Sequence, residues 1–414
     1  MREILASVDI GSNLVKLVVG EVANGKVNIL ASACSLSKGV SKGFVDDPLE
    51  LSKSLKEVFI KCSDIVGLKI DNVLVSIPSE DASFFLSAGS VNIEPEQLIQ
   101  EDDIKECIKN SITGHLETNM HVVSVTPTAY IIDDENSMKE KPIGKEATKL
   151  TVKTIVTSIP KNNIRNILEV FKKININVLD IVLAPIGDYY ESNRKELDKT
   201  IGCFINIGYH TSTVSIFNKG ILTNTLKLDY GSSSIIKDLS YVFKLDKNES
   251  VRLRDELCLA SLDGVSASTK REYRTISGEV VIISEYEASN ICYARILELL
   301  KMIKKEINHL TKTEIHYIMI SGGVSEMENF SNTIEEVFGH SARILNMREV
   351  GARSNIYSTC VGMIKYYADI LDKENETYSI WSEEEIKELS SVSKKISFNE
   401  NSVLGKLFGY FFDN

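Results

Sequence analysis

Residues 6–13 read ASVDIGSN, and residues 203–211 repeat the same shape as CFINIGYHT. Each copy is an apolar strand that ends in a turn of small and polar residues, and a second apolar strand follows each turn. Alternation and β-branched content predict strands on both sides of the two turns. Because Gly11 and Gly208 let backbone N–H groups approach an anion closely, each turn is a candidate phosphate cradle. The repeat predicts a duplicated, two-lobed nucleotide clamp.

Length and composition are compatible with such a clamp. The chain has 414 residues, enough for two domains with buried cores. Its net charge of −11 argues against a nucleic-acid partner, because binding a phosphate backbone requires clustered Lys and Arg. Met1 leads directly into a strand and no apolar run approaches the length of a membrane span, so we expect neither a signal peptide nor a spanning helix. The seven cysteines form no CxxC pair, which predicts reduced core thiols in a cytoplasmic protein.

Changes of pattern divide the chain into a first lobe with an insertion, a second lobe in two parts, a linker and a tail. The predicted boundaries are 1–82 and 160–200 for the first-lobe core, 83–159 for the insertion, 201–229 and 301–371 for the second-lobe core, 230–300 for its small subdomain, 372–400 for the linker and 401–414 for the tail. Strands and helices alternate in both lobes, so the predicted fold class is α/β.

Several elements have clear local signals. Asn24 and Gly25 mark the turn of a β-hairpin. Apolar residues at helical spacing predict a helix over 48–66, and a long amphipathic helix over about 284–310. In the insertion, an acidic stretch predicts a helix over 94–114.

The terminal fourteen residues are amphipathic, and their apolar side chains fill a little over half of a helical wheel. The candidates for membrane contact are Val403, Leu404, Leu407, Phe408, Phe411 and Phe412. A helix docked on the protein body would explain the pattern, but the segment follows a polar linker and is rich in phenylalanine, as interfacial helices often are. Burying these apolar side chains in lipid is favourable, but ordering an unfolded segment costs about 1–2 kcal/mol per residue and cancels most of the gain. One tail should therefore bind lipid reversibly. Stable attachment would need several tails on one assembly.

Five further stretches accompany the two turns in a definite order. They are SKGVSKGFVD at 37–46, residues 91–108, VTPTAYIID at 125–133, IMISGGV at 318–324 and YSTCVG at 357–362. In this order they resemble the actin/Hsp70/sugar-kinase ATPase superfamily and, within it, the FtsA family of bacterial cell-division proteins. The resemblance covers essentially the whole chain. It implies an actin-like two-lobed ATPase fold, with an FtsA-type inserted subdomain in the first lobe and a C-terminal amphipathic helix.

The resemblance implies an ATP-binding, polymer-forming adaptor rather than a catalyst. Such a protein would bind the C-terminal tail of the tubulin-like protein FtsZ, tether FtsZ filaments to the inner face of the cytoplasmic membrane at the division site, and recruit later division proteins. The implied nucleotide-binding residues are Asp9, Gly11, Ser12, Asn13, Lys16, Asn206, Gly208, Thr211, Gly231, Ser232, Glu249, Arg252, Gly322 and Gly323. Asp9 would orient Mg²⁺ through water, and Lys16 would add a positive charge at the β-phosphate of ATP.

The FtsZ site of this family lies on the small part of the second lobe, here about residues 230–300. The FtsZ tail is a short peptide with acidic and apolar residues, so it needs basic groups beside an apolar groove. Arg295 is the first candidate, because Ala294-Arg295 matches a pair in the family's long helix. Further candidates without motif support are Arg271, Arg274, Lys301 and Lys304, each of which is explained as well by a solvated surface charge.

The second turn departs from the family pattern. Family members usually carry an Asp where this chain has Asn206, glycines where it has Tyr209 and His210, and a further Asp where it has Thr213. An amide cannot act as a general base or carry negative charge toward Mg²⁺. The departures predict low nucleotide affinity and at most a weak ATPase, so no catalytic residue is assigned.

Two other interpretations stay open. A sugar kinase of the same fold would need a catalytic aspartate facing the cleft, and Asn206 replaces the best candidate. An FtsA-like scaffold of a pilus or shape-determining assembly would share both lobes. The insertion and the terminal segment favour division over these alternatives.

Overall fold

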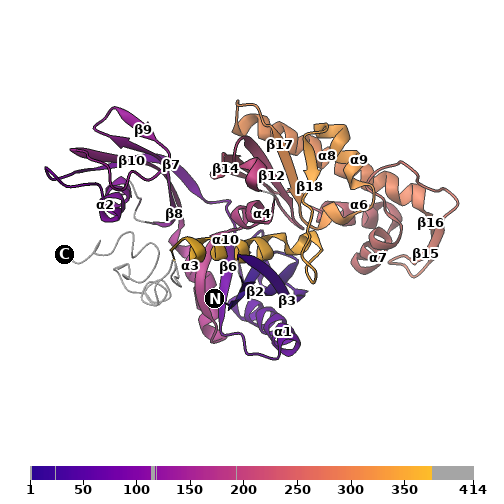
Figure 1. Cartoon of the computed structure of the whole chain (residues 1–414). Coiled ribbons are helices and arrows are strands. Elements are labelled where there is room, and N and C mark those ends of the chain that lie inside the picture. The colour runs from indigo at the N-terminus through magenta and orange to yellow at the C-terminus, as the bar shows by residue number, and fades with distance from the viewer. Residues whose placement is uncertain (1, 24, 113–116, 118, 193, 375–414) are drawn as a thin grey trace.

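Two five-stranded sheets with the same strand order form the core of the computed structural model, which describes residues 2–23, 25–112, 117, 119–192 and 194–374 (Figure 1). The first sheet runs β11 (Asn177–Leu183), β6 (Asn72–Ile77), β1 (Arg2–Ile10), β2 (Leu14–Ala23), β3 (Lys26–Leu36). The second runs β18 (Ala342–Ile344), β17 (Tyr317–Ser321), β12 (Ile201–Ile207), β13 (Ser212–Asn218), β14 (Ile221–Leu228). In each sheet the central strand pairs antiparallel with its hairpin partner and parallel with its other neighbour. The predicted duplication is therefore confirmed.

Helices cover both faces of the first sheet because successive strand residues point to opposite sides. Leu17 and Val19 face the core beneath α1 (Pro48–Val66) and α3 (Lys161–Lys173), whereas Val18 belongs to the cluster beneath α10 (Ser358–Glu374). The bounds of α1 match the prediction, because Asp47 caps its first turn and Gly67 ends it in the left-handed region. The first lobe is thus a helix–sheet–helix sandwich.

The insertion forms a separate four-stranded sheet at one end of the first lobe (Figure 1). Its order is β7 (Ser83–Asn92), β10 (Lys149–Pro160), β8 (Met120–Ile132), β9 (Asn136–Met138), with α2 (Glu101–Ile112) packed against it. The helix predicted from Glu94 is wrong at its start. Pro95 and the positive φ of Glu96 interrupt a helix there, and Ile99 instead hydrogen-bonds to the backbone of Lys145. The predicted end of that helix, Gly114, lies outside the described residues.

The second lobe adds a small helical part to its sheet. This part contains α6 (Ser233–Phe243), α7 (Lys247–Leu257), the hairpin β15 (Lys270–Arg274) and β16 (Val280–Ser284), and α8 (Glu285–Leu310). The predicted long helix is confirmed as α8, which begins at a capping box formed by Ser284 and Glu287. The remaining short elements are β4 (Val40–Ser41), β5 (Phe44–Val45), α5 (Arg194–Leu197), α9 (Phe330–Phe338) and two 3₁₀ turns, η1 (Gly323–Glu326) and η2 (Asn355–Tyr357).

Two helices cross where the lobes meet. The short helix α4 (Ala184–Glu191) follows β11 and packs against α10, which lies between the two large sheets in Figure 1. Only glycines permit this crossing, because a Cβ on Gly362 would lie 1.7 Å from the carbonyl oxygen of Gly187. The close contact places the first residues of α10 beside α4.

Candidate functional site

A cavity of about 750 Å³ lies between the lobes and is lined by both of the repeated turns. Further lining comes from α4, from the last residues of α7 and from the turn after β17. The carboxyl ends of β1 and β12 both point into it, since each strand ends at its turn. A cavity of this size, lined by two glycine turns with polar groups, is a candidate site for a small anionic ligand.

The first turn holds an internal ion pair. The N–H of Gly11 donates to the carbonyl of Leu14 at 3.0 Å, which closes the turn. Lys16 forms an ion pair with Asp9, which also accepts a 2.6 Å hydrogen bond from the hydroxyl of Ser76. Burial alone would lower the pKa of Lys16, but the charge of Asp9 and its hydrogen bond outweigh burial, so the pKa is raised. Lys16 therefore remains charged, with its charge balanced by Asp9.

The second turn closes in the same way with different side chains. The N–H of Gly208 donates to the carbonyl of Thr211, again at 3.0 Å. Tyr209 lines the cavity and lies beneath the ammonium of Lys247, 5.7 Å from the ring centre. His210 points to Ser233, 3.3 Å from Nδ1 to the hydroxyl oxygen. The two bulky residues therefore leave the backbone closure of the turn intact.

Glycines shape two other walls of the site. Gly322, at the end of β17, has φ +97°, and a Cβ there would lie 2.3 Å from the carbonyl oxygen of Ile207. A Cβ on Gly231 would lie 2.6 Å from the carbonyl oxygens of Gly208 and Tyr209. Side chains at either position would push the second turn away from its neighbours.

Asp188 of α4 is a buried carboxylate on the cavity wall. Its oxygens accept hydrogen bonds from Asn206 and Ser321 on one side, and from Ser358 and Thr359 on the other. Burial raises the pKa of Asp188, and the four donors act against that rise. Sequence reasoning did not find this residue, because its partners lie up to 171 positions away in the chain.

Eleven of the fourteen predicted nucleotide residues line the cavity. They are Asp9, Gly11, Ser12, Asn13, Lys16, Asn206, Gly208, Thr211, Ser232, Gly322 and Gly323. Gly231 lies behind the wall, where it allows Ser232 to donate its N–H to the carbonyl of Gly208 at 2.9 Å. Glu249 and Arg252 are not brought into this cavity.

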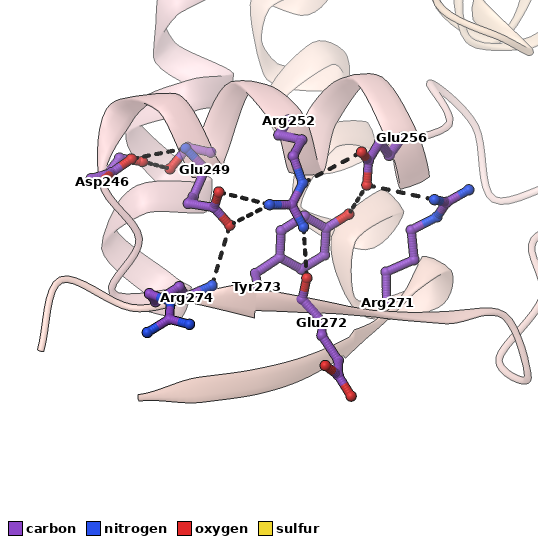
Figure 2. Close-up of polar contacts among 9 residues, drawn as sticks. Asp246, Glu249, Arg252, Glu256, Arg271, Glu272, Tyr273 and Arg274 are labelled. Atoms are coloured by element: carbon purple, nitrogen blue, oxygen red, sulfur yellow. Dashed lines mark hydrogen bonds and ion pairs between the residues drawn. The ribbon is translucent and has the colours of Figure 1, made fainter. Parts of the chain in front are cut away.

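Glu249 and Arg252 instead hold α7 against the β15–β16 hairpin, beside a second hollow of about 350 Å³ (Figure 2). Arg252 donates to both carboxylate oxygens of Glu249 at 2.7 and 2.9 Å, and to the carbonyl of Glu272 at 2.7 Å. Its guanidinium lies 4.7 Å from the centre of the Tyr273 ring. Glu249 and Arg252 do not reach the main cavity because both side chains project from the face of α7 that packs against the hairpin.

The main cavity is acidic. Among its described lining residues the carboxylates are Asp9, Glu80, Asp188, Asp255, Glu256, Glu285, Glu326 and Glu328, whereas the bases are Lys16 and Arg254. Arg254 is paired with Asp255, as Lys16 is with Asp9. A polyphosphate entering this cavity would need a divalent cation to offset the repulsion. No group of three or more potential metal ligands occurs in the part of the chain that the structure describes.

The predicted FtsZ-binding cations differ in their surroundings. Arg295 forms ion pairs with Asp238 of α6 and with Glu298. Lys304 donates to the carbonyl of Val337 at the end of α9, and Arg271 lies 3.7 Å from Glu256. Among the described residues, neither Arg274 nor Lys301 has an ion pair, and Figure 2 shows the Arg274 side chain pointing away from α7.

The predicted membrane-binding residues and most of the predicted linker lie outside the described residues. No helix within residues 2–374, in the parts described, is long and apolar enough to cross a membrane. All seven cysteines are free thiols, and six of them are buried.

Two family models match this chain. The one described as "Cell division protein FtsA" matches residues 203–362, and the one described as "SHS2 domain inserted in FTSA" matches residues 80–158. Together they cover more than half of the 414 residues. The chain belongs to the FtsA family.

Curated FtsA proteins match along most of their length. FtsA of Bacillus subtilis is 25% identical over 371 residues, which cover 88% of this chain and 83% of that protein. FtsA of Escherichia coli K12 is 24% identical over 384 residues, which cover 88% of this chain and 90% of that protein. The chain is accordingly a cell-division protein of the FtsA family.

Solved structures establish the fold of this FtsA-family chain as actin-like. The structure titled "PilM-PilN type IV pilus biogenesis complex" matches with a TM-score of 0.58 at 12% identity, covering 88% of this chain and 98% of that one. MreB5 of Spiroplasma citri bound to ADP matches with a TM-score of 0.55 at 12% identity, covering 90% and 99%. At this identity the likeness shows the fold alone. MreB5 was also solved with AMPPNP, so a protein of this fold binds adenine nucleotides.

Proposed function

We propose that this FtsA-family chain is an adaptor that assembles on the inner face of the cytoplasmic membrane and tethers FtsZ filaments there. Membership of the family supports this role, and the cavity between two closed turns supports nucleotide binding within it. Later division proteins would join the assembly. The observation that carries the proposal is that the FtsA model matches residues 203–362 and the model of the SHS2 domain inserted in FtsA matches residues 80–158.

The proposed ligand of the cavity is ATP with Mg²⁺, bound weakly. The glycine-closed turns would cradle the phosphates, and Asp9 would orient Mg²⁺ through water. The acidic lining and the neutralised Lys16 favour a metal-bound nucleotide over a free one. Because Asn206 is an amide, hydrolysis would be slow or absent. We expect ATP to bind with Mg²⁺ and not with EDTA, in an equilibrium binding assay with fluorescent ATP.

The proposed FtsZ contact is the small part of the second lobe. Arg274 is exposed on β15, where Val280 lies directly across the hairpin and is 57% exposed. A free cation beside an exposed apolar side chain suits a peptide with acidic and apolar residues. Arg295 remains a candidate, but its ion pair with Asp238 makes its substitution disruptive to the packing of α6 on α8.

Flotation of liposomes with fluorescent FtsZ tests the tether. The full chain should float and carry FtsZ, whereas a chain ending at Asn399, or the variant F408S/F411S/F412S, should not float. K406Q is the matched control within the tail and should float. R274E should float without FtsZ, and K26E, an exposed charge reversal in the first lobe, should behave as wild type. Flotation of the truncated chain, or capture of FtsZ by neither wild type nor K26E, would contradict the proposal.

A further inference from the structure

The carboxylate that the second turn lacks is present in the structure, one hydrogen bond away from it. Asn206 is the second-last residue of β12, the position that Asp9 occupies in β1. Its amide nitrogen lies 2.8 Å from Oδ2 of Asp188, which is 2% exposed. In the first turn the carboxylate belongs to the strand itself, as Asp9, whereas beside the second turn it belongs to the helix α4, as Asp188.

This contact fixes the orientation of the Asn206 carboxamide. An ionised carboxylate only accepts hydrogen bonds, so the NH₂ group of Asn206 must point to Asp188. The carboxamide oxygen is then the end that remains for the cavity, which Asn206 lines. The second turn therefore offers the cavity a neutral oxygen acceptor rather than a donor.

Asp188 is itself held in one position by groups from three other elements. Oδ2 also accepts from the hydroxyl of Ser321, at the end of β17, at 3.0 Å. Oδ1 accepts from the hydroxyls of Ser358 and Thr359, the first residues of α10, at 2.6 and 3.0 Å. These four donors and the N-terminus of α10 favour the ionised form of Asp188 and so counteract the effect of its burial.

We propose that Asp188 is the positioning residue of the second phosphate turn: it supplies the negative charge that Asn206 lacks and turns the Asn206 oxygen toward a metal-bound nucleotide. Asp188 does not touch the ligand; it acts through Asn206. The ligand part of this inference rests on the proposed binding of ATP and Mg²⁺. The pairing of Asp188 with Asn206 does not depend on a ligand.

Exchanging the two residues tests the pairing without nucleotide. N206D places two carboxylates at hydrogen-bond distance in a buried site, so its Tm should fall by on the order of 5 °C or more. The exchange D188N/N206D restores one carboxylate and one amide, and its Tm should return to within about 2 °C of wild type. T213D is the control, since Thr213 pairs with Asn206 across the hairpin and also lines the cavity. D188N should not rescue it.

A second measurement applies even if D188N alone fails to fold. The Tm of N206D should fall further between pH 6 and pH 8 than that of wild type, because two adjacent carboxylates share a proton at the lower pH. An exchanged variant no more stable than N206D, equal rescue of T213D, or a pH profile of N206D parallel to wild type would each overturn the pairing.

Binding of ATP separates positioning from a purely structural role. With Mg²⁺ present, D188N should bind ATP about tenfold more weakly than wild type, because the Asn206 oxygen is no longer fixed. The exchanged variant D188N/N206D should bind ATP about tenfold more tightly than wild type, because its carboxylate at position 206 faces the cavity directly. With EDTA the variants should not differ. Equal Mg²⁺-dependent affinities would overturn the positioning role. If wild type binds no ATP at all, the proposed nucleotide function fails, while the Tm comparison still decides the pairing.

Discussion

The two repeated turns have the same backbone and different electrostatics. Each is closed by a glycine N–H bonded at 3.0 Å to the carbonyl three residues later. The first turn balances its own charge, since Asp9 and Lys16 face each other across one hairpin. The second turn contains no acid, and the carboxylate bonded to Asn206 is that of Asp188, in the helix α4 that leads from the first lobe to the second. The first turn is therefore self-contained, whereas the second depends on how the lobes are joined.

Among the substitutions in the two turns, removal of Lys16 should lower the stability of the protein most. K16A leaves the largely buried Asp9 without its counter-charge, which should lower the free energy of unfolding by about 3–5 kcal/mol. In the second turn N206A leaves Asp188 with three remaining donors, so the expected loss is only about 1–2 kcal/mol. Urea unfolding of both variants at pH 7 measures the difference.

The uncharged variant D9N/K16M is the control for that comparison. It removes both charges and should recover most of the stability that K16A loses, because no unpaired charge remains. A loss in K16A no larger than in N206A would show that the first turn does not depend on its ion pair.

Much of this fold could be predicted from the chain because its signals are local. The apolar, β-branched runs of β1 and β2 are local signals. So are Asp47, Pro48 and Gly67 at the ends of α1. The short elements α4, α9 and β18 had no such signal. In α4, Pro185 and Gly187 obscure helical periodicity over eight residues.

The same distinction between local and long-range signals applies to the candidate site. The glycines and polar residues of the turns could be predicted, because the repeat marks them in sequence. Asp188 and the segment from Arg254 to Leu259 could not, because they reach the cavity through tertiary packing. Glu249 and Arg252 were expected there on resemblance alone. Their helix instead turns them toward Tyr273 and the hairpin.

Glu191 is the last residue of α4, three positions after Asp188. Its titration tests how the junction between the lobes responds to pH. Burial raises the pKa of Glu191 to about 8, with Lys365 opposing the rise and Glu349 adding to it. A raised carboxyl pKa means that this group stabilises the fold fully below its unfolded pKa of about 4.3 and loses that contribution as pH rises toward 8. The advantage of wild type over E191Q should therefore decline by up to about 1.4 kcal/mol per pH unit between pH 5.5 and 7.5.

The matched control for this effect is E57Q. Glu57 is an exposed helix residue paired with Lys61, so its substitution should change stability by the same small amount at every pH in that window. Urea unfolding of the three proteins at four pH values measures the slopes. Parallel curves for wild type and E191Q would mean that the junction does not titrate there.

The smallest effect is expected from the bulky residues of the second turn. Neither Tyr209 nor His210 has a positive φ, so alanine is accommodated at both positions. Each substitution should cost about 0.5–1 kcal/mol, for the lost contact with Lys247 or with Ser233. Only Tyr209 lines the cavity, so Y209A should raise the affinity for ATP with Mg²⁺ by a few-fold, whereas H210A should leave it unchanged. Equal affinities in fluorescent-ATP titrations of both variants and wild type would mean that the charge arrangement, and not these side chains, sets the difference between the two turns.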